Sequence, residues 1–207
     1  MGATSAKSNR INVKNLVACL LTTDTAAGVE YGEVFPLAKA MTVDVTPSQA
    51  TGVLYGDGAQ EENIAKLTGL SAKLEVNKIS IENRAKIQGH TYENGVMIYH
   101  EADQAPYIAL GYQIEGTNGY SEYVWLLKGR VQEGNQKANQ ATDSINFSTD
   151  EMTINFIKRE YDGYFEFTAD SSNDDFKSDQ AAAWLTTAPV TYPHHSETTT
   201  TTTSTTT

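Results

Sequence analysis

Residues 105–131 read APYIALGYQI, EGTNGYS and EYVWLLKGRV, which are two apolar runs joined by a polar connection. Every second residue from Ile108 to Ile114 is apolar, which is the pattern of a strand with one buried face. The Asn118-Gly119 pair tolerates the positive φ angles that a hairpin reversal requires. The second run is apolar on both faces, so it predicts a central strand covered on both sides, with another copy of the chain as one candidate cover.

Shorter alternating segments extend the strand pattern along the chain, at residues 41–46, 70–77, 96–99 and 152–156. Asn94-Gly95 predicts a turn before residues 96–99, and Asp162-Gly163 predicts a hairpin turn from residues 152–156 into residues 164–167. The connections are too short for repeated crossover helices, so the strands are expected to pair antiparallel. The sequence therefore predicts a mainly β fold, either a β-sandwich or a partly closed barrel.

Two short helices are expected beside the strands. Ser80 can cap a flanking α-helix that ends at Gly89, with the glycine in the left-handed conformation. This helix is so short that it must gain its stability by packing on the sheet. A second helix is expected near residues 175–185, capped by Asp174 or Asp175.

Length and charge narrow the class of protein. The chain has 207 residues, which suits one domain with a single core. It carries 15 Lys and Arg against 26 Asp and Glu, a net charge of -11. This charge disfavours a nucleic-acid binder, because the phosphate backbone would be repelled rather than neutralised. An acidic surface also suits a protein that its charge keeps soluble.

The composition of the chain predicts one domain with a flexible segment at each end. Residues 1–10 are expected to form a flexible arm, and residues 11–190 one β domain. Residues 191–207 are mostly threonine and cannot offset their ordering entropy, so a disordered C-terminal tail is expected. This tail is either a remnant of a linker to a surface decoration domain or a flexible end.

The single cysteine, Cys19, cannot form an intrachain disulfide and is expected to be a small core residue. The apolar run around it, from Leu16 to Leu21, has six residues and is shorter than the roughly 7 to 15 of a signal peptide. The sequence also contains no run near the roughly 20 apolar residues of a membrane span. A protein made in a cytoplasm and without a membrane anchor is therefore expected.

The sequence contains no convincing match to a metal-binding, calcium-binding or nucleotide-binding motif. His90 and His100 show no zinc spacing with cysteine or carboxylates. Residues 170–175 are acidic but lack the glycine and the distal glutamate of an EF-hand. The Gly56-Asp-Gly58 stretch matches neither a phosphate-binding loop nor a dinucleotide fingerprint. The sequence therefore predicts no cofactor, no metal site and no enzyme activity.

Two long polar connections stand out. Residues 47–69 lie between two predicted strands and are longer than an ordinary hairpin connection. Such a loop is either functional or a solvated surface loop. Residues 133–140 form the second connection, which either meets a neighbouring copy or is simply surface.

A resemblance to a known family rests on an ordered set of motifs. The two central runs carry D-x-x-P-Y-x-A-L-G at residues 103–111 and V-W-L-x-K-G at residues 124–129. Three further pieces keep their order and spacing, namely VKNL at residues 13–16 with YG at 31–32, LYGD at 54–57, and the helix of residues 80–89. Together they resemble the major tail protein family, or tail tube protein family, of long-tailed phages, of the type common in phages of Gram-positive bacteria. The resemblance runs from residue 11 to residue 189.

The resemblance implies a tail-tube-like fold and a structural protein of the virion, synthesised in the host cytoplasm. It implies that subunits form hexameric rings whose inner strands join into one barrel, and that the rings stack into the tail tube. It also implies the partners, which are further copies of the chain and the tape-measure, tail-terminator and tail-tip proteins. DNA would pass through the lumen of the tube without stable binding.

By the same resemblance, residues 47–69 match the long loop with which a subunit reaches the adjacent ring. The candidate inter-ring contacts implied there are Tyr55, Asp57, Glu61 and Glu62. The candidate ring or core residues of the central strand pair are Tyr107, Tyr112, Tyr123 and Trp125. Of these residues, Tyr112, Tyr123 and Trp125 are either interface anchors or ordinary core packing.

Two other classes of function stay open beside the tail tube subunit. The first is a secreted or surface β module that binds carbohydrate or protein, against which the missing signal peptide is the strongest objection. The second is an enzyme, for which the sequence offers no marked nucleophile.

Overall fold

A computed structural model describes residues 9–56, 59–117, 119–132 and 149–191, apart from the side chains of residues 54–62. The structure is 59% strand and 10% helix, with two short helices. The prediction of a mainly β fold with a short helix is therefore confirmed. Within the described ranges, neither helix is long and apolar enough to cross a membrane.

The strands and helices follow one another along the chain in this order: β1 (Arg10–Thr25), β2 (Gly28–Tyr31), β3 (Phe35–Ala38), β4 (Ala40–Gly56), β5 (Ala59–Val76), α1 (Ile81–Gln88), β6 (Thr91–Glu93), β7 (Val96–Ile98), β8 (Tyr107–Gly116), β9 (Ser121–Gln132), β10 (Asp150–Phe156), β11 (Glu166–Asp170) and α2 (Ser178–Trp184).

One antiparallel sheet contains nine of these strands in the order β2-β1-β8-β9-β10-β5-β4, with β3 pairing with β1 and β11 pairing with β9. The predicted central hairpin is present as β8 and β9, and Gly119 at their turn has a φ of 83°. Strand β9 lies between β8 on one side and β10 and β11 on the other, so its prediction as a central strand is confirmed.

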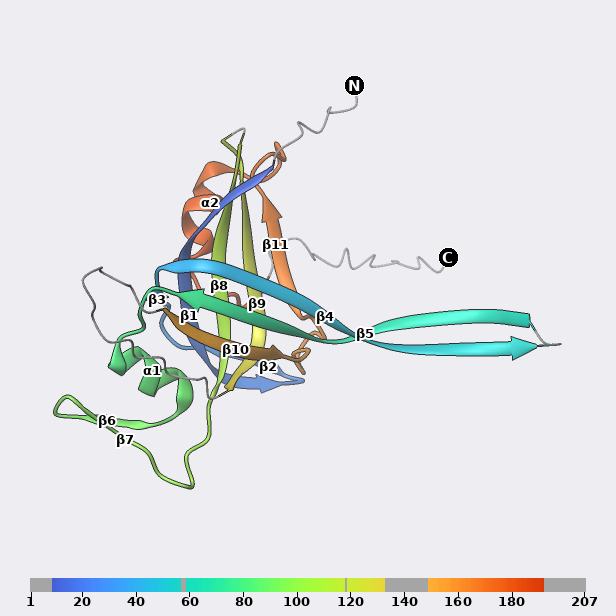
Figure 1. Cartoon of the computed structure of the whole chain (residues 1–207). Coiled ribbons are helices and arrows are strands. Elements are labelled where there is room, and N and C mark those ends of the chain that lie inside the picture. The colour runs from blue at the N-terminus through green and yellow to red at the C-terminus, as the bar shows by residue number, and fades with distance from the viewer. Residues whose placement is uncertain (1–8, 57–58, 118, 133–148, 192–207) are drawn as a thin grey trace, which may run out of the picture.

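The sheet curls around a single interior and forms a partly closed barrel (Figure 1). Large apolar side chains from both halves of the sheet fill this interior, including Leu74, Ile108, Leu110, Leu126 and Phe156. The barrel stays open along one seam, where residues 10–13 of β1 and residues 41–45 of β4 line a gap of about 540 Å³.

A second, smaller apolar cluster lies outside the barrel, under α2. Cys19, Ala109, Trp125 and Leu127 project from β1, β8 and β9, and Leu185 covers them from the end of α2. The Trp125 indole N–H donates to the Trp184 carbonyl oxygen at 2.7 Å and fastens this cover to β9. Strand β9 is therefore covered on both faces by its own chain, and burial raises the pKa of the Cys19 thiol to about 12.

The two helices differ in how well the sequence predicted them. The Ser80 hydroxyl accepts a hydrogen bond from the Asn83 N–H at 3.1 Å, and Gly89 ends α1 with a φ of 78°, so both caps are confirmed. The predicted cap of the second helix is wrong, because α2 begins after Lys177. Residues 171–176 are still turning, and the Gln180 side chain accepts from the Lys177 N–H at 3.0 Å in place of an aspartate cap.

The predicted hairpin at Asp162-Gly163 is also wrong. A turn with a φ of 74° is present at Gly163, but β10 and β11 both pair with β9 instead of with each other. The chain leaves β9 after the Ile157 N–H donates to the Lys128 carbonyl, and it returns where the Leu127 N–H donates to the Phe165 carbonyl. Residues 157–165 are therefore an excursion, and β11 continues the line of β10 along β9.

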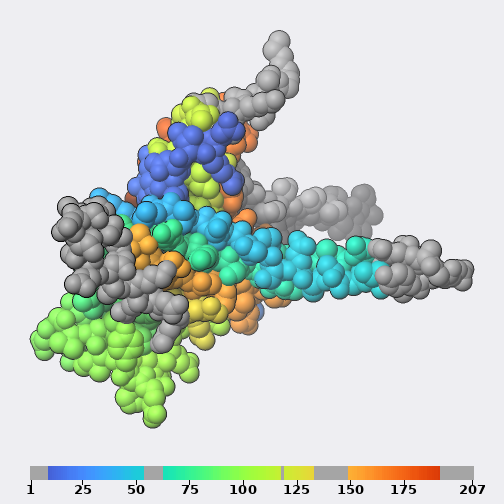
Figure 2. Space-filling view, in the orientation of Figure 1, coloured from blue at the N-terminus to red at the C-terminus, as the bar shows by residue number. Residues whose placement is uncertain are grey.

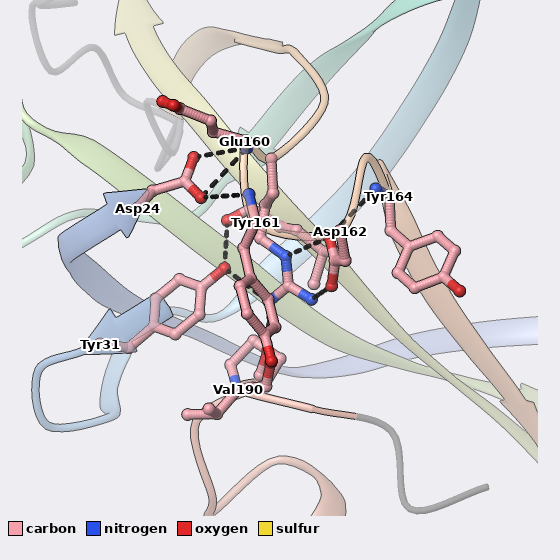
Figure 3. Close-up of polar contacts among 10 residues, drawn as sticks. Asp24, Tyr31, Glu160, Tyr161, Asp162, Tyr164 and Val190 are labelled. Carbon is pink, nitrogen blue, oxygen red and sulfur yellow. Dashed lines mark hydrogen bonds and ion pairs between the residues drawn. The ribbon is translucent and has the colours of Figure 1, made fainter. Parts of the chain in front are cut away.

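A fully buried arginine on this excursion ties distant segments together (Figure 3). Arg159 is 0% exposed and pairs with Asp162. Its guanidinium also donates to the Tyr31 hydroxyl at 3.3 Å and to the carbonyl oxygens of Pro189 and Val190 at 2.7 and 3.2 Å. The segment that follows α2 is thereby fixed to β2 and to the excursion.

Asp24, at the end of β1, makes a second link to the excursion (Figure 3). Its carboxylate accepts from the N–H groups of Glu160 and Tyr161 and lies 2.6 Å from the Lys128 ammonium nitrogen. Burial alone would raise the pKa of Asp24, but the hydrogen bonds from Lys128 and from these two N–H groups lower it below its usual value.

Candidate assembly surfaces

The prediction that residues 47–69 form a loop is wrong, because β4 and β5 continue through residues 47–56 and 59–69 and pair with each other. The ladder runs from Ala40 opposite Val76 to Gly56 opposite Ala59. Strand β5 pairs with β10 only over residues 70–76, so beyond this base β4 and β5 pair only with each other among the described residues. Residues 48–56 and 59–69 form this two-stranded extension, here called the arm.

The arm projects far from the barrel, as both the ribbon and the space-filling view show (Figures 1 and 2). At about 3.3 Å per residue, residues 48–56 of β4 span about 30 Å. A two-stranded hairpin alone is marginally stable in water, since each strand is paired on one side only and has no core to pack on. The arm is therefore a candidate contact element.

The ladder register defines the two faces of the arm. Gln49, Thr51 and Val53 lie opposite Leu67, Ala65 and Asn63, and these six residues share one face. This side is called the arm face. It is uncharged over its described residues, and Val53 and Leu67 are 45% and 37% exposed on it. The other face carries Ile64, which is 57% exposed, next to Lys66.

Three of the four predicted inter-ring residues, Tyr55, Glu61 and Glu62, lie near the end of the described arm. Tyr55 pairs with Gln60 and Glu62 with Leu54 in the ladder, and Glu61 lies between these positions in β5. Asp57 lies outside the described residues, as do the side chains of the other three. Their contact with an adjacent ring stays a prediction, while the apolar residues Val53, Ile64 and Leu67 were missed by the sequence reasoning.

The outer face of β4, β5, β10 and the end of β9 is polar over its described residues. One row across the strands contains Thr46, Ser71, Asn155, Arg130 and Tyr107, and the next contains Asp44, Lys73, Thr153 and Gln132. A third row contains Thr42, Glu75 and Glu151. This side of the barrel is called the polar face.

Charges on the polar face are nearly balanced. The rows contain three carboxylates, Asp44, Glu75 and Glu151, and two cations, Lys73 and Arg130. The Lys73 ammonium nitrogen lies 3.7 Å from the Glu151 carboxylate. Hydroxyl and amide side chains occupy the remaining positions of the rows, apart from Tyr107.

Tyr107 lies at the margin of the polar face. Its ring centroid is 4.2 Å from the Arg130 guanidinium carbon and 5.0 Å from the Lys128 ammonium nitrogen, so two cations stack on one ring. This half-buried tyrosine therefore holds two basic side chains in fixed positions.

The other three predicted aromatic residues are packed within the subunit. Tyr112 is 6% exposed and faces the barrel interior, where burial raises its pKa to about 12. Trp125 is 1% exposed and lies under α2, and Tyr123 packs against Phe176 with ring centroids 6.0 Å apart. Core packing, rather than exposure as interface anchors, describes these three residues in the single subunit.

Two strand edges face the open seam of the barrel. Over the described residues, β4 pairs only with β5, and residues 10–13 of β1 pair only with β8. The seam also exposes two large apolar residues, Ile11 at 63% and Met41 at 53%. Open edges with exposed apolar residues are a template for pairing with another strand.

Neither a metal-binding cluster among the described residues nor a known relative points to a function. In the part of the chain that the structure describes, no three His, Cys, Asp or Glu residues are grouped so that they could hold a metal ion. The sequence matches neither a model of a known protein family nor a curated protein.

Proposed function

We propose that this chain is a major tail tube subunit of a long-tailed phage virion, which assembles into stacked hexameric rings around a DNA-conducting lumen. The arm is the observation that carries the proposal. It occupies the position of the loop that the resemblance assigns to contact between rings, and it leaves a two-stranded ribbon with apolar residues in solvent.

The open seam supports the closure of a ring. Neighbouring subunits would pair the free edge of β4 with the free edge of β1, so that six sheets become one continuous barrel. This pairing would cover Ile11 and Met41 and would remove edges that otherwise promote aggregation.

The polar face supports a lumen. Protein interfaces are enriched in aromatic residues and depleted of Ser, Lys, Glu and Asp, whereas this face has the opposite composition. It is suited to water and to passing DNA, which would meet hydroxyl and amide groups with few net charges. The cover formed by α2 lies over other strands and would face the outside of the tube. The tape-measure, tail-terminator and tail-tip proteins would be its further partners, as the resemblance implies.

One observation favours a different candidate, a ligand-binding β module. A cavity of about 210 Å³ beside α2 is lined by the rings of Trp125, Phe167, Phe176 and Trp184. Aromatic walls of this kind suit an apolar or sugar ring. This candidate expects a monomer that binds a small ligand, and it gives the arm no role.

Negative-stain microscopy of the concentrated protein distinguishes the two candidates. The tail tube proposal expects rings or tubes of uniform width. Isolated monomers at every concentration, together with saturable binding of a sugar at the aromatic cavity, would instead support the ligand-binding module.

A further inference from the structure

We propose that the small lobe between α1 and β8, residues 90–106, carries the docking site for the arm of a second copy in the adjacent ring. This inference rests on the proposed function, but it goes further because it names the acceptor surface. The resemblance supplies only the element that reaches out, and the acceptor comes from the structure.

The lobe exposes an apolar patch. Strands β6 and β7 form a separate two-stranded sheet, joined by a turn at Asn94 and Gly95 with φ angles of 51° and 83°. Val96, Ile98 and Tyr99 are 57%, 50% and 54% exposed, and they are called the lobe patch. Three large, exposed apolar side chains within four residues of a polar, acidic chain mark an interaction surface.

The lobe patch is held in a fixed arrangement. The His90 Nδ1 atom lies 2.8 Å from an Asp103 carboxylate oxygen, which also accepts from the His100 N–H at 2.9 Å. The Tyr99 ring lies against the His90 ring with centroids 4.1 Å apart. These contacts close residues 90–103 into a loop, so the patch loses little conformational entropy when a partner binds.

The arm face matches the lobe patch in chemistry. Both present aliphatic side chains, Val53 and Leu67 on the arm and Val96 and Ile98 on the lobe. The arm face brings no charged group from its described residues, so a charge at the contact would come from the lobe, where Glu93 lies opposite Val96.

The arm and the lobe extend from different sides of the barrel (Figures 1 and 2). The arm of one copy can therefore meet the lobe of the next without reaching its own. A contact between two different surfaces is heterologous, so it propagates from copy to copy instead of closing a dimer. Once one of the six contacts between two rings has formed, it raises the effective concentration of the surfaces that form the other contacts. The two rings would therefore bind each other more tightly than a single contact allows.

Disulfide cross-linking between two variants that each carry one introduced cysteine tests the contact. Val53→Cys and Ile98→Cys proteins are mixed, assembled and treated with a mild oxidant, and the native Cys19 stays unreactive because it is buried. A cross-linked dimer is expected in the mixture. The matched control replaces Ile98→Cys by Ile157→Cys, which is a similarly exposed isoleucine at 42% on the excursion, and this mixture should give no dimer.

A second pair of variants measures the effect on stacking. Val96→Ser with Ile98→Ser should keep the melting temperature and the rings but reduce tube length at least tenfold, whereas Ile157→Ser should leave tube length unchanged. Tubes that form normally in the lobe variant, without a Val53–Ile98 cross-link in the mixture, would overturn the lobe as acceptor and leave the tail tube proposal intact. A wild-type protein that forms neither rings nor tubes would overturn both.

Discussion

The Arg159 guanidinium donates to the Pro189 carbonyl oxygen at 2.7 Å, which joins the excursion of residues 157–165 to the segment after α2. The cation is fully buried, and Asp162 and the Tyr31 hydroxyl complete its surroundings. A buried charge whose partners are all in place is costly to break, since removal of either side leaves a polar group unsatisfied in the interior.

Replacement of Arg159 by methionine should therefore lower the free energy of unfolding by about 3 kcal/mol, because the Asp162 carboxylate and two backbone carbonyls lose their donor. Denaturant unfolding of the purified variant measures this change. The matched control is Lys158→Met, at the exposed neighbouring position, which should change the stability by less than about 0.5 kcal/mol. Equal effects of the two substitutions would contradict the structural role of the buried arginine.

Stability should also fall at alkaline pH. Burial raises the pKa of Cys19, Tyr31 and Tyr112 to about 12, above their ordinary values of 9.0 for the thiol and 10.0 for the phenols. The unfolded chain therefore releases these protons first. The free energy of unfolding keeps this contribution below about pH 9 and loses it as the pH rises toward 12.

The Tyr112→Phe variant isolates one of these groups, because it keeps the ring and removes the titrating hydroxyl. Its loss of stability between about pH 10 and pH 12 should be smaller than that of the wild type. Urea unfolding at several pH values measures both slopes. Identical slopes for the two proteins would show that the Tyr112 proton is not retained in the folded state.

Local signals predicted the parts of the fold that depend on a few neighbouring residues. Gly119 at the β8–β9 turn and Gly89 at the end of α1 both take the positive φ angles that the sequence led us to expect. Central strand β9 was likewise predictable, because a strand buried on both faces is apolar on both faces. These signals need no knowledge of distant segments.

Pairings that depend on distant segments were not predictable. The sequence of the arm predicts a loop instead of two strands. A ribbon in solvent has no buried face, so its sequence shows no apolar alternation. The sequence predicts that β10 and β11 form a hairpin, because no residue near Gly163 indicates that both strands pair with β9. The polar face could not be predicted either, since each of its rows combines residues from strands that are far apart in the sequence.

Shortening of the arm should separate folding from stacking. Replacement of residues 49–68 by Asn-Gly keeps the base of the hairpin, where Ser48 lies opposite Gly69, and it removes residues that bury little surface within the subunit. The melting temperature should change by only a few degrees, while tubes are lost. A control with Lys66→Ser on the other face of the arm should still form tubes. Tubes of normal length from the shortened protein would contradict the role of the arm.

Assembled tubes should not bind double-stranded DNA near physiological salt. The chain carries a net charge of -11, and the polar face has nearly balanced charges, so the counterion release that drives nonspecific binding is absent. Titration of labelled duplex at rising salt concentration measures this. A dissociation constant of roughly 10⁻⁴ to 10⁻⁶ M that weakens steeply with salt would reveal a basic stripe and would contradict passage of DNA without stable binding.

The most direct test of the central claim is the rotational symmetry of the assembled protein in end-on electron micrographs. Class averages of the wild-type protein should show rings with six equal subunits around an open centre, because the tail tube proposal closes the seam between β1 and β4 through neighbouring copies. Side views should show these rings stacked at a constant axial repeat. Particles that remain single subunits, or closed two-fold dimers without a lumen, would contradict the account.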